Sequence, residues 1–216
     1  MRRALVRQVT EVRDAPLCPE LRLRVAPEPL APWEATERLE GSVQPPPFWA
    51  HAWPGGLALA RLVLDGPELV QGLRVLDFAS GCGVSAIAAA RAGASEVLAT
   101  ELDLFALAAV AENAELNGVC VASSSSDVID TDAGWDVVLV GDVFYEDELS
   151  RRIERWLRVL HARGAQIRIG DPGRSFLPMK SLSCVATYAV APVPAWDSVL
   201  DRPARIWTFG ASAPAR

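Results

Sequence analysis

Hydrophobic and polar positions along this chain alternate between short apolar runs and longer stretches with helical spacing. The apolar runs have the length of strands, and each is followed by a stretch with the spacing of an amphipathic or alanine-rich helix. The predicted strands lie at 73–78, 96–100, 119–122, 135–140 and 165–169. The predicted helices lie at 57–64, 84–92, 103–116 and 146–161. Strands that alternate with helices indicate an α/β fold with a parallel sheet.

The two ends of the chain depart from this alternation. Near the C-terminus, the runs at 182–191 and 204–209 follow each other without a helix, which predicts antiparallel strands at the edge of the sheet. The polar, weakly patterned residues through Pro16 predict a surface arm, followed by a strand at 20–25 and a helix at 33–39. The run Gln44-Pro45-Pro46-Pro47 is a stiff connector. We therefore expect residues 1–47 to form an N-terminal extension and residues 48–216 to form the core.

Composition and charge exclude several classes of function. Half of the 216 residues are hydrophobic, which is enough for one folded domain. The net charge of −6 disfavours a nucleic-acid partner, which needs a basic surface. The chain has no apolar run of membrane-spanning length, so we expect no membrane partner. Its start lacks the pattern of a signal or transit peptide, which favours a bacterial cytoplasmic location. Four widely spaced cysteines and two histidines favour reduced thiols and no metal site.

The stretch from Leu73 to Ala92 carries the first chemical indication. A strand ending near Asp77 leads into a turn of small residues and then into a helix, an arrangement that offers backbone N–H groups to a ligand. The turn that we expect to bind a cofactor contains Ala79, Ser80, Gly81 and Gly83. Two cofactor families use this geometry. The segment also matches the nicotinamide fingerprint G-x-G-x-x-A. A carboxylate at Asp77 would repel the pyrophosphate of a dinucleotide, whereas it would attract S-adenosylmethionine, which carries an ammonium and a sulfonium. A structural turn that binds nothing is the third interpretation.

Acidic residues recur where the predicted strands end. They are Asp77, Glu101, Asp127 and Asp142. Ligands of open α/β sheets bind outside the carboxyl ends of the strands, so each acid has a candidate role. Asp77 would serve the methionine end of the cofactor through backbone or water, Glu101 the ribose hydroxyls and Asp127 the adenine amino group. Asp142 would lie beside the transferable methyl. Any one of them could instead be a loop acid or a helix cap.

Aromatic residues precede the first core helix. We place Trp53 near the cofactor, because Pro54-Gly55-Gly56 puts it at the start of that helix, although a core role fits Trp49 or Trp53 equally well. His51 between them is more typical of a bystander than of a base. For Arg174, in the segment GDPGR, the sequence leaves open whether it anchors a partner's carboxylate or closes a turn.

Several segments resemble a known family. VLDFASGCG, ATELD and GDVFYEDEL resemble the seven-β-strand methyltransferases. With PPPFWAHAWPGGLALARLVLD and IGDPGR, the chain is similar to the electron-transfer-flavoprotein β-subunit lysine methyltransferases from about Pro19 to its last strand. This resemblance implies a Rossmann-like, seven-stranded, mostly parallel sheet and the cofactor S-adenosyl-L-methionine, which leaves as S-adenosyl-L-homocysteine. It also implies the flavoprotein β subunit as protein substrate. The chain departs from the pattern D-x-G-x-G-x-G at Ala79, whose methyl replaces the first glycine.

The resemblance also assigns catalytic residues. The segment from Asp142 to Tyr145 corresponds to the D-x-x-F/Y element of protein-lysine members. We expect Asp142 to accept a hydrogen bond from the incoming lysine amine and to direct its lone pair. Tyr145, rather than Phe144, is expected to supply an aromatic wall for the amine.

Other functions fit parts of the pattern. They are a small-molecule, nicotinamide-type amine methyltransferase, a methyltransferase of a ribosomal protein, a nicotinamide oxidoreductase and a non-catalytic cofactor-binding subunit. The intact GDVFY segment argues against the last. Neither the oligomeric state nor the target lysine follows from the sequence.

Overall fold

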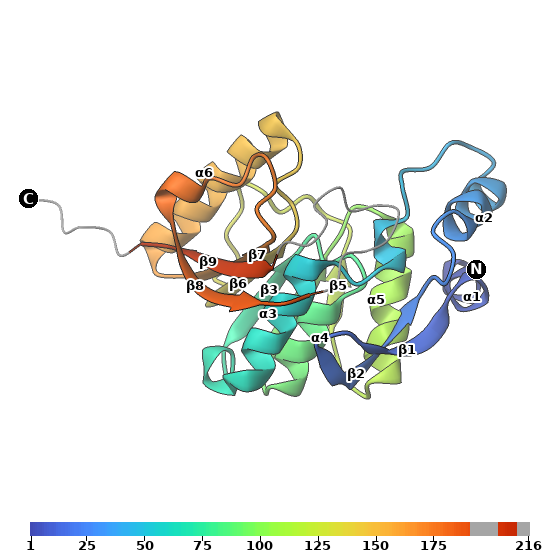
Figure 1. Ribbon diagram of the computed structural model, residues 1–216, viewed down its shortest axis with the longest axis horizontal. Coiled ribbons are helices and arrows are strands. Elements are labelled where there is room, and N and C mark those ends of the chain that lie inside the picture. The colour runs from blue at the N-terminus through green and yellow to red at the C-terminus, as the bar shows by residue number, and fades with distance from the viewer. Residues whose placement is uncertain (191–202, 211–216) are drawn as a thin grey trace, which may run out of the picture.

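A seven-stranded sheet forms the centre of the computed structural model, which describes residues 1–190 and 203–210 (Figure 1). The strand order is β5-β4-β3-β6-β7-β9-β8. The strands are β3 (Arg74–Phe78), β4 (Glu96–Thr100), β5 (Ala122–Ser124), β6 (Val137–Gly141), β7 (Gln166–Asp171), β8 (Leu182–Tyr188) and β9 (Ala204–Phe209). The first five of these pair in parallel, and β9 pairs antiparallel with both β7 and β8. The predicted mostly parallel sheet with an antiparallel C-terminal edge is confirmed.

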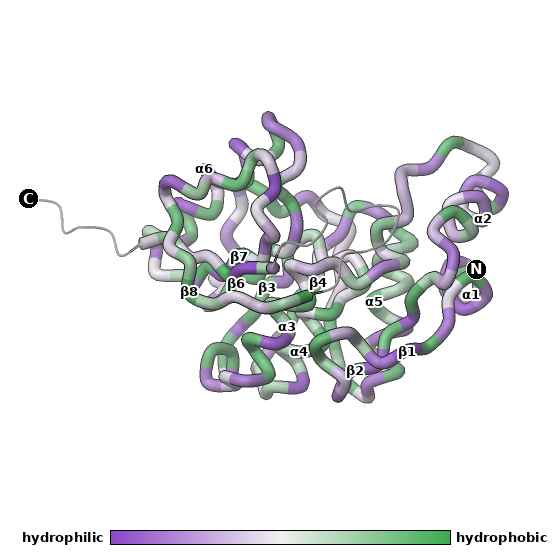
Figure 2. The backbone as a smooth tube through the Cα atoms, in the orientation of Figure 1, coloured by the Kyte–Doolittle hydropathy of each residue, from purple (hydrophilic) through white to green (hydrophobic). Residues whose placement is uncertain are grey.

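Helices cover both faces of this sheet (Figure 1). They are α3 (Pro54–Asp65), α4 (Val84–Arg91), α5 (Leu104–Leu116) and α6 (Asp147–Arg163), with short 3-10 turns at Phe48–Ala50, Pro67–Leu69 and Met179–Ser181. Successive residues of β3 separate the two halves of the core: Val75 packs with α3 and α4, whereas Leu76 packs with α6. Along α6, hydrophobic and hydrophilic residues alternate as expected of a helix with one buried side (Figure 2). Of the helices described, none combines the length and the apolar character needed to cross a bilayer.

The register of the sheet brings the carboxyl ends of its central strands to one level. Phe78 at the end of β3 lies opposite Thr100 of β4 and Val140 of β6. Gly141 of β6 lies opposite Gly170 of β7. The segments that follow these four strands therefore meet at one edge of the sheet.

The first sixteen residues are more ordered than the sequence predicted, whereas the strand expected at 20–25 and the helix expected at 33–39 are present. Helix α1 (Arg2–Val9) and strand β1 (Glu11–Ala15) occupy the segment expected to be a surface arm, and that prediction is wrong. Strand β1 pairs with β2 (Cys18–Val25), and helix α2 (Ala31–Glu40) follows. The charged pattern of the first residues is misleading, because Arg3 and Arg7 both pair with Glu112, a buried carboxylate on α5. The division of the chain at residue 47 stays a prediction.

Strands β5 and β8 differ in their bounds from the predicted strands. The strand expected at 119–122 instead forms at β5, because Val119 and Val121 pack against the core before the chain reaches its pairing partner Leu98. At the C-terminal side, β8 ends at Tyr188, and Ala191 of the predicted strand lies outside the described residues. The other predicted helices and strands of the core occur within a few residues of their expected bounds.

Candidate active site

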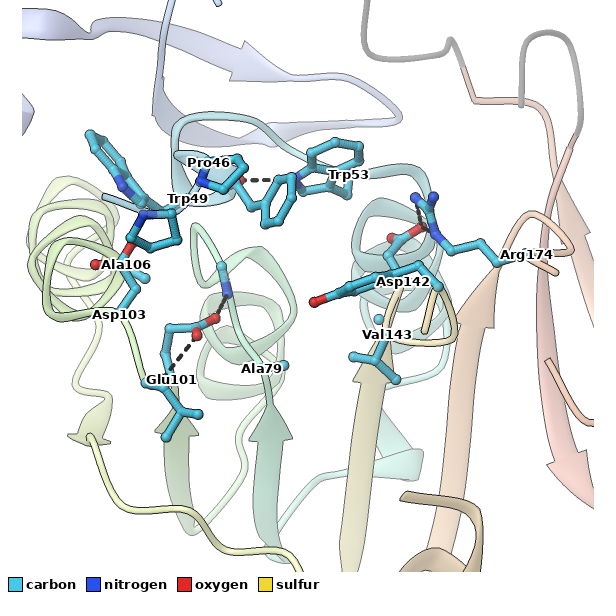
Figure 3. A pocket seen from close by; sticks show the side chains of 16 residues that line it. Pro46, Trp49, Trp53, Ala79, Glu101, Asp103, Ala106, Asp142, Val143 and Arg174 are labelled. Atoms are coloured by element: carbon cyan, nitrogen blue, oxygen red, sulfur yellow. Dashed lines mark hydrogen bonds and ion pairs between the residues drawn. The ribbon is translucent and has the colours of Figure 1, made fainter. Parts of the chain in front are cut away.

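A cleft with a volume of about 590 Å³ opens at the carboxyl ends of the central strands. Its walls come from the connector before α3, the glycine turn after β3, the segment between β4 and α5, and the segments after β6 and β7. Glu101 and Asp142 lie on opposite sides of this cleft, below Pro46 and Trp53 (Figure 3). Two of the four predicted strand-end acids thus line one hollow.

The glycine turn forms the floor between these acids. Gly81 has a φ of +53° and open space where a Cβ would be, so a ligand can approach its backbone. Its N–H donates to Oε2 of Glu101 at 3.2 Å, and the N–H of Leu102 donates to Oε1 at 2.9 Å. Ala79 also lines the cleft and also has a φ of +53°, a conformation that alanine rarely adopts. Gly83 lines neither this cleft nor the second cavity below, and a Cβ there would lie 3.0 Å from Val110.

Asp77 and Ser80 support the turn from underneath. Asp77 is 2% exposed, and its Oδ2 accepts a hydrogen bond of 3.0 Å from the N–H of Ala86 at the start of α4. Burial raises the pKa of this carboxyl to about 7. The Ser80 hydroxyl donates to the main-chain oxygen of Asp77 at 2.8 Å. Asp77 lines neither the cleft nor the second cavity described below, and its role toward the methionine end of a cofactor stays a prediction.

A second cavity of about 210 Å³ adjoins the cleft, and Ala79, Glu101 and Tyr145 border both. Its walls are largely apolar and include Phe78, Leu102, Ile129, Val143, Leu149 and Ile153. Asp127 lies at its margin, where one oxygen accepts from the N–H of Ile129 and the other pairs with Arg152 at 2.8 Å. An apolar slot with a carboxylate at one end suits a flat base with an amino group. The role of Asp127 toward adenine stays a prediction.

Asp142 is the most constrained acid of the cleft. It follows β6 with a φ of +60°, and its side chain is 8% exposed. Oδ2 accepts from the N–H groups of Gly55 and Gly56 at 2.6 and 3.1 Å. Oδ1 accepts from Nη2 and Nε of Arg174 at 2.9 and 3.3 Å. Burial raises the pKa of Asp142, and Arg174 opposes that shift. Each carboxylate oxygen thus already has two donors, and the predicted bond to a substrate amine is not among them.

Glycines at two distant positions make this arrangement possible. A Cβ on Gly55 would lie 2.1 Å from the carbonyl oxygen of Gly170 on β7. A Cβ on Gly141 would lie 3.1 Å from the nitrogen of Gly56. The start of α3 therefore rests directly on the backbone of β6 and β7, and this explains Gly55 of WPGG, Gly141 and the glycine before Asp171.

Arg174 reaches the cleft from the loop after β7. The loop is fixed by Asp171, whose Oδ1 accepts from the N–H groups of Gly173 and Arg174 at 2.7 Å each. The Arg174 guanidinium carbon lies 5.6 Å from the ring centre of Trp53. Burial and the neighbouring Asp142 raise the pKa of Asp171 to about 7. Arg174 thus lines the cleft and binds a carboxylate of its own chain, and a contact with a partner's carboxylate stays untested.

Aromatic side chains border the mouth of the cleft. Trp53 donates from Nε1 to the carbonyl oxygen of Phe48 at 2.7 Å, and the two rings are 5.6 Å apart. Phe48 also lies 6.3 Å from Tyr145, which is 54% exposed. Phe144, by contrast, is fully buried in the core with α6. Trp49 is buried and stacks on Phe105, although it also borders the cleft.

Sequence reasoning missed some lining residues. Pro45 and Pro46 were treated as a connector and Phe48 was given no role, but all three line the cleft, and the aromatic residue following the prolines was the available signal. Asp103 caps α5, accepting from the N–H of Phe105 at 2.7 Å, and it also borders the cleft. His51 lines neither of the two cavities, and burial lowers its pKa to about 4.

These features fit a cationic nucleoside. Gly81 allows close backbone approach, and Glu101 keeps acceptor capacity for hydroxyl groups, since no described basic side chain pairs with it. The adjoining cavity, with about 210 Å³ and largely apolar walls, has room for a planar base. S-adenosyl-L-methionine combines these three chemical properties in one molecule.

Comparisons with known proteins decide the family. A model of ribosomal protein L11 methyltransferase (PrmA) matches residues 60–141. An electron transfer flavoprotein beta subunit lysine methyltransferase from Xenopus laevis is 36% identical over 96% of this chain and 86% of that protein. The chain belongs to this lysine methyltransferase family. The Danio rerio member is 42% identical over 76% of this chain, and the matched region covers 64% of that longer protein.

Solved structures agree with the family fold. The Thermus thermophilus 16S rRNA methyltransferase RsmC, determined with AdoMet and guanosine, has a TM-score of 0.59 at 18% identity, covering 93% of this chain and 50% of that one. Ribosomal protein L11 methylase from Lactobacillus delbrueckii has a TM-score of 0.50 at 23% identity, covering 69% and 75% of the two chains. At these identities the likeness concerns the fold. As a member of a family of S-adenosylmethionine-dependent protein-lysine methyltransferases, this chain takes S-adenosyl-L-methionine as its cofactor.

Proposed function

We propose that this protein transfers methyl groups from S-adenosyl-L-methionine to lysine side chains of the electron transfer flavoprotein β subunit. The observation that carries the proposal is the cleft at the sheet edge, in which a glycine turn and Glu101 face the D-x-x-Y segment from Asp142 to Tyr145. Family relatives named for this substrate support the choice of protein.

The residues of the cleft divide the work. When bound, the cofactor supplies a methyl on a sulfonium, whose C–S bonding pair stays with sulfur as the N–C bond forms. We expect Glu101 to accept hydrogen bonds from the two ribose hydroxyls, and Asp127 to accept one from the adenine amino group. Tyr145 offers its ring to the arriving amine, and Asp142 holds the start of α3 and Arg174 in place around it. Alignment of the amine with the methyl is the main contribution of these side chains.

The shape of the mouth favours a protein substrate over a small amine. Tyr145 is 54% exposed and Phe48 41% exposed, so the methyl end of the cleft opens to the surface between aromatic rings. Leu102, on the opposite wall, is 68% exposed. A long lysine side chain projecting from a folded partner can enter such an opening, whereas a small-molecule enzyme gains from a closed pocket.

The decisive experiment is incubation of the protein with the purified electron transfer flavoprotein and S-adenosyl-L-methionine. We expect the β subunit to gain mass in steps of one methyl on lysine. Asp142→Ala should stop turnover while changing S-adenosylhomocysteine affinity by no more than about fivefold, because Asp142 lies at the methyl end. Label only in small solutes would favour the small-amine alternative, and label in ribosomal protein L11 the ribosomal one. Binding of a dinucleotide alone would contradict the methyltransferase assignment of the turn. A bacterial cytoplasmic location and the lack of nucleic-acid or membrane partners stay predictions.

A further inference from the structure

Arg174 binds Oδ1 of Asp142, the carboxylate oxygen that the start of α3 leaves open. The other oxygen, Oδ2, points at the backbone of Gly55 and Gly56. Oδ1 is bound by the guanidinium fork, and both side chains are largely buried, at 13% and 8% exposure. The pair lines the same cleft as Tyr145, where the substrate amine must arrive. Without Arg174, the amine would meet a buried carboxylate with a vacant oxygen.

A vacant carboxylate at this point would favour the wrong form of lysine. An opposite charge within about 4–6 Å raises the pKa of an ammonium by stabilising its charged form. Lysine already has a pKa near 10.4 in water, and only its neutral amine has a lone pair for attack on a methyl group. A bare Asp142 would therefore bind the ammonium tightly and hold it in the unreactive state.

We propose that Arg174 is a positioning residue that neutralises and occupies Asp142, so that the substrate lysine enters as the neutral amine instead of being trapped as its ammonium. This inference rests on the proposed function. The loop after β7 holds the guanidinium in place for this role, because Asp171 fixes the backbone at Gly173 and Arg174, and Trp53 lies against the guanidinium. The lysine ammonium releases its proton to solvent before methyl transfer, and no side chain has to keep it.

Other titratable groups surround the same space. Asp171 comes from β7, Glu101 from the end of β4, and Tyr145 and Glu146 from the segment after β6. Asp103 borders the cleft from the start of α5, and His51 precedes α3. Among these, Asp171 has a pKa raised to about 7, so it titrates within the pH range of the kinetic test, which therefore needs a variant that removes this carboxyl. Burial raises the pKa of Glu101 and that of Tyr145, and His51 is neutral above about pH 4.

The kinetic test compares Arg174→Gln with Arg174→Lys over pH 6.5–10, using the flavoprotein β subunit. For Arg174→Gln we expect the apparent pKa of the kcat profile to rise by about one unit, so that kcat is about tenfold lower than wild type below that pKa and approaches wild type above it. Arg174→Lys keeps the charge and should stay within about threefold of wild type at every pH. If the guanidinium of Arg174 only held the structure together, Arg174→Lys should instead lose activity at every pH, because lysine cannot reproduce the geometry of the guanidinium.

A matched control is available on α6. Arg158 binds a single oxygen of Glu154 through Nε and Nη2 at 3.1 and 2.7 Å, which is the same fork as in the Arg174–Asp142 pair. It lines neither cavity. Arg158→Gln should leave the pH profile unchanged. Asp171→Asn removes the group near the cleft whose pKa is about 7. The upward shift of the pH profile caused by Arg174→Gln should persist in the Asp171→Asn protein.

A binding measurement decides the inference without turnover. Titration with n-butylamine at pH 7, in the absence of cofactor, should show about tenfold tighter binding to Arg174→Gln than to wild type. The double variant Asp142→Asn/Arg174→Gln should lose that gain. Unchanged amine binding, or a loss of kcat equal at all pH values, would overturn the role of Arg174. Failure of the wild-type protein to methylate the β subunit would instead overturn the proposed function, and the amine titration would still report on Arg174.

Discussion

The two sides of the cleft are built in different ways. On the side of β4, Glu101 accepts hydrogen bonds from the backbone N–H groups of Leu102 and Gly81, which lie one and twenty positions away in the chain. On the side of β6, Asp142 accepts from Gly55, 87 positions away, and from Arg174, 32 positions away. The first side is a local motif, whereas the second is assembled by the fold.

The difference also concerns charge. Glu101 has no described basic partner and is available to a ligand with hydroxyl groups or positive charge. Asp142 is compensated inside the protein by Arg174. The carboxylate on the β4 side of the cleft is therefore available to a ligand, whereas the carboxylate on the β6 side holds the start of α3 and Arg174 in place.

The largest effect should come from the assembled side. Gly55→Ala places a Cβ 2.1 Å from the Gly170 oxygen and 2.5 Å from Oδ2 of Asp142, so α3 must move. We expect a loss of about 3 kcal/mol or more in unfolding free energy, measured by urea titration, together with loss of methylation. Gly56→Ala is the control, because its Cβ would meet only a Val84 methyl at 3.3 Å. Equal effects of the two substitutions would refute the backbone contact.

The local side should respond in ligand affinity. Glu101→Gln removes the charge that faces the cleft, and we expect S-adenosylhomocysteine to bind about 10- to 100-fold more weakly by calorimetry, with the fold intact. Asp127→Asn makes the same chemical change at the margin of the second cavity. Because Asp127 is exposed and paired with Arg152, its effect should be no more than about fivefold. A larger effect at Asp127 would reverse the assignment of the two acids.

Asp77, which supports the glycine turn from below, should make the stability of the fold depend on pH. The folded state keeps Asp77 protonated up to about pH 7, whereas the unfolded chain loses that proton near 3.8. The folded protein thus binds more protons in this window, and its stability falls as the pH rises from about 4 to about 7. Asp77→Asn should reduce the loss between pH 5 and 8 by about 2 kcal/mol. Asp171→Asn should remove a similar share, and a wild-type protein equally stable across this range would contradict both pKa shifts.

The smallest effect concerns the residue that departs from the usual glycine pattern. Ala79→Gly removes the backbone strain of an alanine in the left-handed region at φ +53°, but it also raises the conformational entropy of the unfolded chain. Because these two effects oppose each other, the unfolding free energy should change by no more than about 0.5–1 kcal/mol. Removal of the methyl should tighten S-adenosylhomocysteine binding by up to about threefold. Ala106→Gly removes a methyl from the same cleft within helix α5, where it should destabilise by about 1 kcal/mol.

Most of the sheet could be predicted because its strands are continuous apolar runs. All of Val137–Val140 is buried, and that composition points to a strand covered on both faces. The N-terminal helix was not predictable in the same way. Its stability depends on a carboxylate more than a hundred residues away, at Glu112, and no local pattern of the first ten residues reveals that partner.

The same reasoning applies to the site. Gly81 and Glu101 could be placed from the sequence, because a strand, a turn and the next strand end fix their separation. The partners of Asp142 could not, since the approach of Gly55 to Gly170 arises only when α3 crosses two strands. The sequence therefore indicated which residues belong to the cleft on this side, but not that Asp142 is already saturated with donors.

The Glu112 cluster makes one wall of the cleft depend on the first two turns of the chain. Arg3, Arg7 and Arg24 all pair with this one carboxylate, and helix α5, which carries it, also presents Ala106 to the cleft. Deletion of residues 1–7 would remove two of the three counter-ions of a buried acid on that helix.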